Sequence, residues 1–160
     1  MKKILIADDD ESVRKMVARV LESAGYATLL AGDGREAVEK FRDAQPDMVL
    51  LDVKMPEEGG WGAFEQINRV AGLTPVIVIT AWSNQYDQAA QRGIDALMEK
   101  PLDLPLLLRT IENLLGETEE QRTRRLTDRS FTTARLTDAA RAATKISRPF
   151  MNPLARLSQT

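Results

Sequence analysis

The stretch "PVIVIT", Pro75–Thr80, decides the fold expected of this chain. Its four central residues are apolar and β-branched, which favours a strand. Because they do not alternate with polar residues, both faces of that strand must be covered. Strands buried on both faces are typical of parallel sheets that carry helices on two sides. The run ends in a polar group only at Thr80.

Other apolar runs of strand length lie on either side of this stretch, and helical periodicity follows each of them. The expected strands are Lys3–Ala7, Tyr26–Ala31, Met48–Leu51, Pro75–Thr80 and Ala96–Glu99. The first three expected helices begin near Val13, Ala37 and Trp61, and the last two span Ser83–Arg92 and Leu104–Leu115. Five strand–helix units predict an α/β protein with a doubly wound, five-stranded parallel sheet and helices on both faces.

Histidine and cysteine are both absent from the 160 residues, which excludes several kinds of chemistry. A histidine triad, a histidine general base, a cysteine nucleophile and a disulfide are ruled out. No apolar run approaches the roughly 20 residues that a membrane-spanning helix needs. The N-terminal "MKKILIADDD" has too short an apolar run for a secretory signal. We therefore expect a cytoplasmic protein without membrane contact.

Charge divides the chain into an acidic body and a basic tail. Residues 1–116 contain 13 Lys and Arg against 19 Asp and Glu, whereas residues 117–160 contain 9 against 5. The last expected helix ends just before Gly116, so we predict one domain over residues 1–116. Residues 117–160 are interpreted as a basic C-terminal tail or helical extension, whose role the sequence does not define.

Polar side chains close four of the expected strands. Asp8, Asp9 and Asp10 follow the first strand, and Asp52 ends the third, within "MVLLDVKMP" (Met48–Pro56). Thr80 and Lys100 close the fourth and fifth. In a doubly wound sheet, ligands bind at the carboxyl ends of the strands. We therefore expect these groups to meet at one edge of the sheet.

Each of these residues also has an ordinary structural interpretation. An acidic run before a helix is usually a helix cap, an aspartate after a strand is usually a turn residue, and Lys-Pro is usually a loop. Clustered carboxylates, however, repel one another unless a cation joins them, and an all-oxygen ligand set favours Mg²⁺ or Mn²⁺. A carboxylate can attack phosphorus, while an amine and a hydroxyl stabilise phosphoryl oxygens. Occurring together and in this order, the residues predict phosphoryl transfer with Asp52 as the nucleophile.

The motifs "ILIADDD", "LLDVKMPEEGGW", "VIVITAW" and "MEKP" resemble those of the receiver domain of two-component response regulators, over about Lys2–Leu115. The resemblance implies a flavodoxin-like fold of strand order 2-1-3-4-5. It also implies that Asp52 accepts a phosphoryl group from a histidine kinase or phosphotransferase. Such a chain is not an enzyme in the usual sense, because it catalyses only its own phosphorylation and dephosphorylation.

The resemblance further implies roles for individual residues. Asp8, Asp9 and Asp52 would bind Mg²⁺ (or Mn²⁺), together with the backbone carbonyl of Lys54. Thr80 and Lys100 would transmit the switch, and the peptide bond before Pro101 would be cis. Phosphorylation would then alter the face made by the Ser83–Arg92 helix, the Ala96–Glu99 strand and the Leu104–Leu115 helix. That face is the expected surface for a homodimer or an unidentified downstream protein.

The chain departs from the family pattern at four positions. Leu97 stands where the family usually has an aromatic switch residue, which puts an aromatic-rotamer mechanism in doubt, although a leucine can still pack differently in two states. Gly59 replaces a commoner Asp or Asn, and we expect little effect from it. Lys54 and Trp82 stand two residues after Asp52 and Thr80, where both side chains should lie beside a phosphoryl group. We expect both to slow hydrolysis of an aspartyl phosphate, unless they point to solvent.

Two other functions are weaker alternatives. A DNA-binding regulator acting through the basic tail would use a faint helix-turn-helix pattern at Leu136–Leu157, but Pro153 would break its recognition helix. Nucleic-acid binding is therefore less expected than a partner-binding or partly disordered tail. A phosphotransfer enzyme of the haloacid-dehalogenase type needs a second acid two residues after the nucleophile, and Lys54 cannot serve as that acid.

Overall fold

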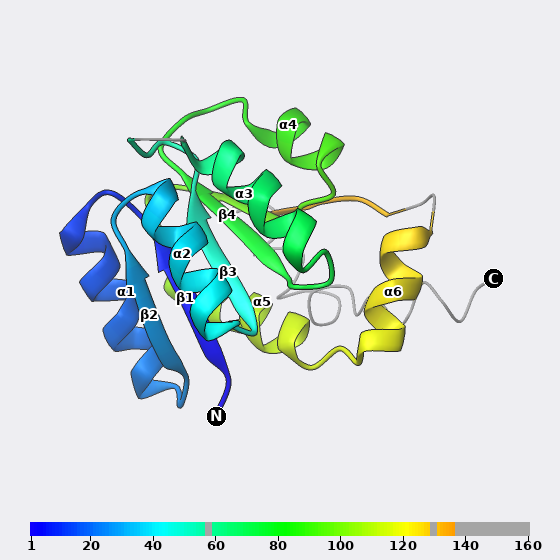
Figure 1. Ribbon diagram of the computed structural model, residues 1–160, viewed down its shortest axis with the longest axis horizontal. Coiled ribbons are helices and arrows are strands. Elements are labelled where there is room, and N and C mark those ends of the chain that lie inside the picture. The colour runs from blue at the N-terminus through cyan, green and yellow to red at the C-terminus, as the bar shows by residue number, and fades with distance from the viewer. Residues whose placement is uncertain (57–58, 129–130, 137–160) are drawn as a thin grey trace.

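The computed structural model describes residues 1–56, 59–128 and 131–136, and its centre is a parallel β-sheet (Figure 1). The strands are β1 (Lys3–Ala7), β2 (Ala27–Ala31), β3 (Met48–Asp52), β4 (Val76–Thr80), β5 (Ala96–Glu99) and β6 (Ala134–Leu136). They are hydrogen-bonded in the order β2-β1-β3-β4-β5-β6. The expected order 2-1-3-4-5 is confirmed, and a sixth strand that the sequence did not predict extends the sheet.

Helices cover both faces of the sheet. They are α1 (Glu11–Ser23), α2 (Gly34–Ala44), α3 (Gly59–Val70), α4 (Tyr86–Gln91), α5 (Leu104–Leu115) and α6 (Glu119–Thr127). Alternate strand residues belong to two separate cores, one packed against α2, α3 and α4 and the other against α1 and α5. Every residue of β3 and β4 is buried, as the uninterrupted apolar run at Pro75–Thr80 predicted. The doubly wound arrangement is confirmed.

Short polar side chains and left-handed residues set the helix ends. Asp10 caps the N-terminus of α1 by accepting hydrogen bonds from the backbone N–H groups of Ser12 and Val13. Gly25, with φ +94°, follows the same helix. α4 is shorter than the predicted Ser83–Arg92 helix, because Asn84 adopts a left-handed conformation (φ +63°) that a helix cannot include.

The chain continues past α5 into structured elements on the β5 side of the sheet. Thr118 begins α6 with a capping box, in which its side chain accepts from the backbone of Gln121 and the Gln121 side chain accepts from the backbone of Thr118. Figure 1 shows α6 at the opposite end of the sheet from β2. β6 then pairs in parallel with β5. Within the tail predicted for residues 117–160, the part up to residue 136 thus contains a helix and a strand.

A buried charge cluster attaches α6 to the sheet. The carboxylate of Asp95 accepts hydrogen bonds from Arg122 Nη1 (2.7 Å) and Nη2 (3.0 Å), and from Arg125 Nη2 (2.6 Å). Arg125 also binds Glu117, and Arg122 donates to the carbonyl of Leu73. Asp95 itself is 4% exposed and also accepts from the backbone, so its charge is balanced inside the protein.

The helix-turn-helix pattern considered for Leu136–Leu157 lies outside the described residues, apart from Leu136. Among the helices that the structure describes, none is long and apolar enough to cross a membrane.

Candidate functional site

Asp52 lies at the carboxyl end of β3, where its carboxylate is buried yet polar groups surround it. The Asp52 side chain is 3% exposed. One carboxylate oxygen accepts the backbone N–H of Lys54 (2.9 Å), and the other faces the Lys100 ammonium (3.2 Å). The carboxylate is therefore held in one orientation at the edge of the sheet.

The three acids after β1 have different positions and partners. Asp8 is buried, and its carboxylate accepts from Lys100 Nζ (2.8 Å) and from the backbone N–H of Asp10 (2.9 Å). Asp9 is exposed, whereas Asp10 is the N-cap of α1. The cap interpretation is thus correct for Asp10, and Asp8 and Asp9 are left to face Asp52.

Asp8, Asp9 and Asp52 form a compact carboxylate group that fits a divalent ion. One carboxylate oxygen from each of them lies within 4.8 Å of the others. Oxygen-only ligands at this spacing suit a hard cation such as Mg²⁺. Burial raises the pKa of Asp52, and the charge of Asp8 adds to that rise against the opposing Lys54 N–H and Lys100 ammonium. A bound cation would relieve this mutual repulsion.

Lys100 lies at the end of β5 and bridges the two buried carboxylates. Burial alone would lower its pKa, but the hydrogen bond to Asp8 and the charge of Asp52 outweigh burial and raise the pKa of Lys100. The ammonium therefore stays charged at neutral pH. The Lys100–Pro101 peptide bond is cis, as the family resemblance implied.

Thr80 and the two unusual residues, Lys54 and Trp82, lie around the same strand ends. Thr80 is fully buried one position beyond Ile79, which is opposite Asp52 in the sheet register. Its hydroxyl oxygen accepts the backbone N–H of Trp82 (3.0 Å). The side chains of Lys54 and Trp82 are exposed, the latter at 45%. Both are thus free to approach a group attached to Asp52.

Gly60, for which sequence analysis predicted no role, makes a close backbone contact at the site. It begins the first turn of α3, and its N–H donates to the carbonyl of Val53 (3.2 Å). A Cβ atom at Gly60 would lie 2.3 Å from both the carbonyl oxygen of Asp52 and the Cα of Val53. Only glycine lets α3 pack this closely against the end of β3.

Leu97 is buried in the core that faces α4, where the family usually has its aromatic switch residue. At 1% exposure its side chain fills part of that core. The doubt about an aromatic-rotamer mechanism at this position therefore stands.

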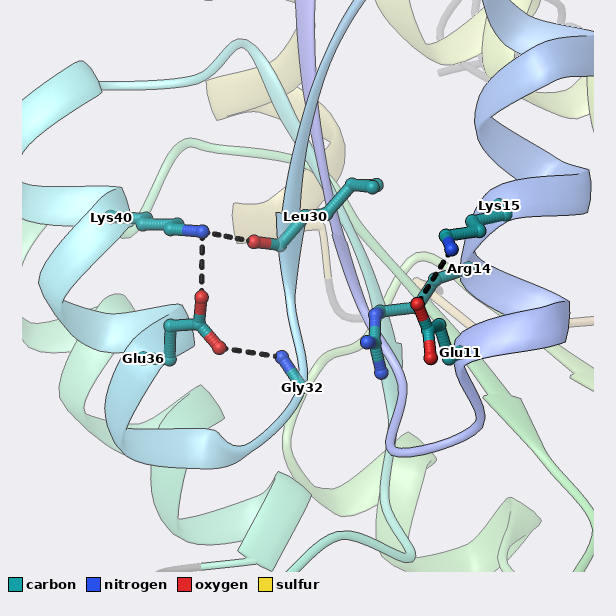
Figure 2. Close-up of a pocket in the computed structure, with 7 residues that line it drawn as sticks. All are labelled: Glu11, Arg14, Lys15, Leu30, Gly32, Glu36 and Lys40. Carbon is teal, nitrogen blue, oxygen red and sulfur yellow. Dashed lines mark hydrogen bonds and ion pairs between the residues drawn. The ribbon is translucent and has the colours of Figure 1, made fainter.

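A hollow separate from the carboxylate cluster lies between α1, the end of β2 and the start of α2 (Figure 2). Its charged groups pair among themselves. Lys15 binds Glu11 (2.6 Å), and Lys40 binds Glu36 (2.6 Å). Arg14 donates to the backbone carbonyl of Asp8 (2.7 Å), and so supports the site without facing a ligand. We assign no ligand to this hollow.

The fold and the converged side chains define an α/β protein with a carboxylate site at the carboxyl edge of a parallel sheet. The sequence profile of the response regulator receiver domain matches residues 4–112, and the chain belongs to this family. The family resemblance inferred from the four motifs is therefore confirmed. Receiver domains are phosphoacceptor switches of two-component systems rather than enzymes in the usual sense.

Relatives of known function and solved structures agree with this assignment. Response regulator RR06 of Streptococcus pneumoniae is 35% identical over 70% of this chain, which spans about half (52%) of that protein. The polar-differentiation response regulator DivK of Brucella anthropi is 31% identical over 72% of this chain and 98% of its own length. A CheY-like receiver domain of Methanospirillum hungatei has a TM-score of 0.71 at 27% identity, covering 76% of this chain and 98% of its own.

A further similar structure is that of a complex. Response regulator TrrA of Thermotoga maritima, in complex with Mg²⁺ and BeF, has a TM-score of 0.67 at 28% identity, covering 71% of this chain and 99% of its own. The similar regions stop short of the full chain in each of these four comparisons.

Proposed function

We propose that this chain is a response regulator in which Asp52 accepts a phosphoryl group, in the presence of Mg²⁺, from a histidine kinase or phosphotransferase. The observation that carries the proposal is the buried Asp52 carboxylate, grouped with Asp8 and Asp9 and contacted by Lys100. Such a group costs stability unless a cation and a phosphoryl group occupy it, and a purely structural site would have no need of it.

The residues divide the chemistry between them. A carboxylate oxygen of Asp52 attacks phosphorus, and the bond from phosphorus to the donor breaks as the new acyl phosphate bond forms. The Lys100 ammonium neutralises charge on the phosphoryl oxygens, and the Thr80 hydroxyl donates a hydrogen bond to one of them.

Asp8, Asp9, Asp52 and the Lys54 carbonyl would hold Mg²⁺. A bound Mg²⁺ ion supplies charge neutralisation at the phosphoryl oxygens.

The structural consequence of phosphorylation would appear at the ends of β4 and β5. A phosphoryl group adds charge and acceptor oxygens beside Asp52, which draws Thr80 and Lys100 toward it. Because Thr80 lies opposite Glu99 in the register, a shift of β4 would also displace β5. The face formed by α4, β5 and α5 would then change, and we propose it as the surface for a homodimer or a downstream protein.

Phosphorylation of the full chain with acetyl phosphate tests the proposal. In Mg²⁺-containing buffer we expect the intact mass to increase by one phosphoryl group, and we expect EDTA to abolish the increase. Asp52→Asn should also abolish it, because the amide cannot form an acyl phosphate. Asp43→Asn, which changes an exposed acid at the end of α2, should be labelled like the wild type. Equal labelling of the Asp52→Asn variant would contradict the proposal.

Lys54 and Trp82 are expected to lengthen the lifetime of the phosphorylated state. An ammonium group can pair with the phosphoryl oxygens and a bulky indole can exclude water, and both side chains are exposed beside the site. We expect Lys54→Ala and Trp82→Ala to lose the phosphoryl group several times faster than the wild type, measured after removal of acetyl phosphate. Unchanged or longer lifetimes would show that both side chains point to solvent.

A further inference from the structure

The C-terminal segment 131–136 occupies the edge of the sheet beside β5. β6 pairs with β5 in the register Ala96 to Ala134 and Met98 to Leu136. The N–H of Ala134 donates to the carbonyl of Asp95 (2.9 Å), and the hydroxyl of Thr133 donates to the carbonyl of Ile94 (2.6 Å). Leu136 is buried in the core shared with α5. This segment therefore covers part of the face that a dimer or downstream protein would use.

Tyr86, the first residue of α4, connects this segment to the part of the sheet that carries the candidate site. The hydroxyl of Tyr86 donates to the carbonyl of Thr133 (2.9 Å). The guanidinium of Arg135 lies 5.4 Å from the centre of the Tyr86 ring, a distance at which the two attract each other. Tyr86 therefore contacts two residues of the segment, Thr133 and Arg135.

The segment and the helix before it are held by different kinds of contact. α6 is attached by the buried cluster of Asp95 with Arg122 and Arg125. β6 is three residues long and lies at the sheet edge, and the ion pair between Arg135 and Glu99, at 3.7 Å, is half exposed. A short edge strand of this kind opens at lower cost than an anchored helix.

The position of Tyr86 depends on the loop that follows β4 and connects the candidate phosphorylation site to α4. Thr80 ends β4, and only residues 81–85 separate it from Tyr86. The Thr80 hydroxyl, which would turn toward a phosphoryl group, now accepts the N–H of Trp82 within that segment. α4 has six residues and lacks a side-chain cap at Gln85, so a change at Thr80 can displace it easily.

We propose that residues 131–136 form a detachable strand that covers the α4–β5 surface in the unphosphorylated chain, and that phosphorylation of Asp52 releases it by withdrawing Tyr86. The proposal rests on the proposed function of Asp52. It assigns the coupling role to an aromatic residue on α4, in a chain that has Leu97 in place of the family's usual aromatic switch residue. Release uncovers the edge of β5, whose backbone groups can then pair with another strand.

Hydrogen exchange of the full chain, with and without acetyl phosphate and Mg²⁺, tests the proposal. We expect exchange of the amides at 134–136 to become about tenfold faster on phosphorylation, a coupling typical of two linked sites. Exchange over Glu119–Thr127 should stay unchanged, because the Asp95 cluster still holds α6. The intact mass of the same sample gives the fraction of chains that are phosphorylated.

Two tyrosine variants separate coupling from general loosening. Tyr86→Phe keeps the ring but removes the hydroxyl donor, so its 134–136 amides should exchange faster than those of the wild type without acetyl phosphate, while its labelling is unchanged. Tyr26→Phe makes the same chemical change beside β2, at the opposite edge, and should leave 134–136 protected.

Three results would overturn the inference. Phosphorylated chains whose 134–136 amides exchange at the unphosphorylated rate would refute release and leave the proposed function intact. Equal exchange in Tyr86→Phe and the wild type would remove Tyr86 as the coupling group. Failure of Asp52 to take up any label would refute the proposed function, and the switch with it.

Discussion

Replacing Arg122 with alanine is expected to lower the free energy of unfolding by about 3–5 kcal/mol, as is typical when one partner of a buried ion pair is removed. Arg122 is 6% exposed and donates two hydrogen bonds to the Asp95 carboxylate. Alanine leaves that carboxylate buried with Arg125 as its remaining side-chain partner. It also leaves the carbonyl of Leu73 without the donor it has in the native structure. Urea titration of the full chain measures the change.

Arg124→Ala is the matched control for this substitution. Arg124 is on the same helix, but its side chain is 62% exposed, and it pairs with Glu120 one turn away. Exposed pairs of this kind contribute about 0.3–0.5 kcal/mol, so the control should be nearly as stable as the wild type. If Arg122→Ala were no less stable than Arg124→Ala, α6 could not be attached through Asp95.

The effect of Arg122 should also depend on pH in a defined direction. Burial alone would raise the pKa of Asp95, but Arg122 and Arg125 outweigh it and lower that pKa below its ordinary value of 3.8. A lowered folded-state pKa means that the ion pair stabilises the protein above about pH 4 and is lost as the pH falls through the folded value. The stability difference between wild type and Arg122→Ala should therefore persist at neutral pH and narrow in acid. A difference that widened in acid would show that Asp95 is not the partner that matters.

The parts of the fold that the sequence predicted are those in which many residues repeat one pattern. The alternation of apolar runs and helical spacing recurs five times, and both β3 and β4 are apolar until their last residue. Repetition of this kind leaves few other arrangements for the buried groups. The convergence of Asp8, Asp52 and Lys100 followed from the same rule, because parallel strands end at one edge.

The parts that the sequence did not predict depend on a few long-range contacts. β6 has only three residues, and "ARL" shows no strand pattern of its own. α6 is almost entirely polar, and the partners of Arg122 and Arg125 include Asp95, about thirty positions earlier in the chain. A charged helix that would ordinarily face solvent is thus attached through buried polar partners that lie outside it. No local periodicity reports such a contact.

Among the residues that take no direct part in the chemistry of the site, Gly60 is expected to be the most sensitive to substitution. Replacing it with alanine should lower the free energy of unfolding. The new Cβ would lie 2.3 Å from the carbonyl oxygen of Asp52 and from the Cα of Val53. Both are backbone atoms of buried residues, so no flexible side chain can move aside. Overpacking of this kind typically costs about 1–3 kcal/mol and occasionally more. We expect a loss at the upper end of that range in urea titration.

The same substitution should also impair phosphorylation. To relieve the contact, the start of α3 and the end of β3 must separate, and Asp52 is the last residue of β3. Displacement of a reacting group by about 1 Å can cost roughly a hundredfold in rate. We therefore expect Gly60→Ala to take up label from acetyl phosphate about a hundred times more slowly, at a temperature where circular dichroism shows it folded.

Gly32→Ala separates this steric effect from a general intolerance of alanine near the site. A Cβ at Gly32 would meet the ends of two side chains, Arg14 at 3.4 Å and Glu36 at 3.7 Å, which is ordinary contact without any clash against the backbone. That variant should be labelled at nearly the wild-type rate. If Gly60→Ala were also labelled at the wild-type rate, the end of β3 would have to tolerate displacement. The rigid placement of Asp52 by α3 would then have no part in the reaction.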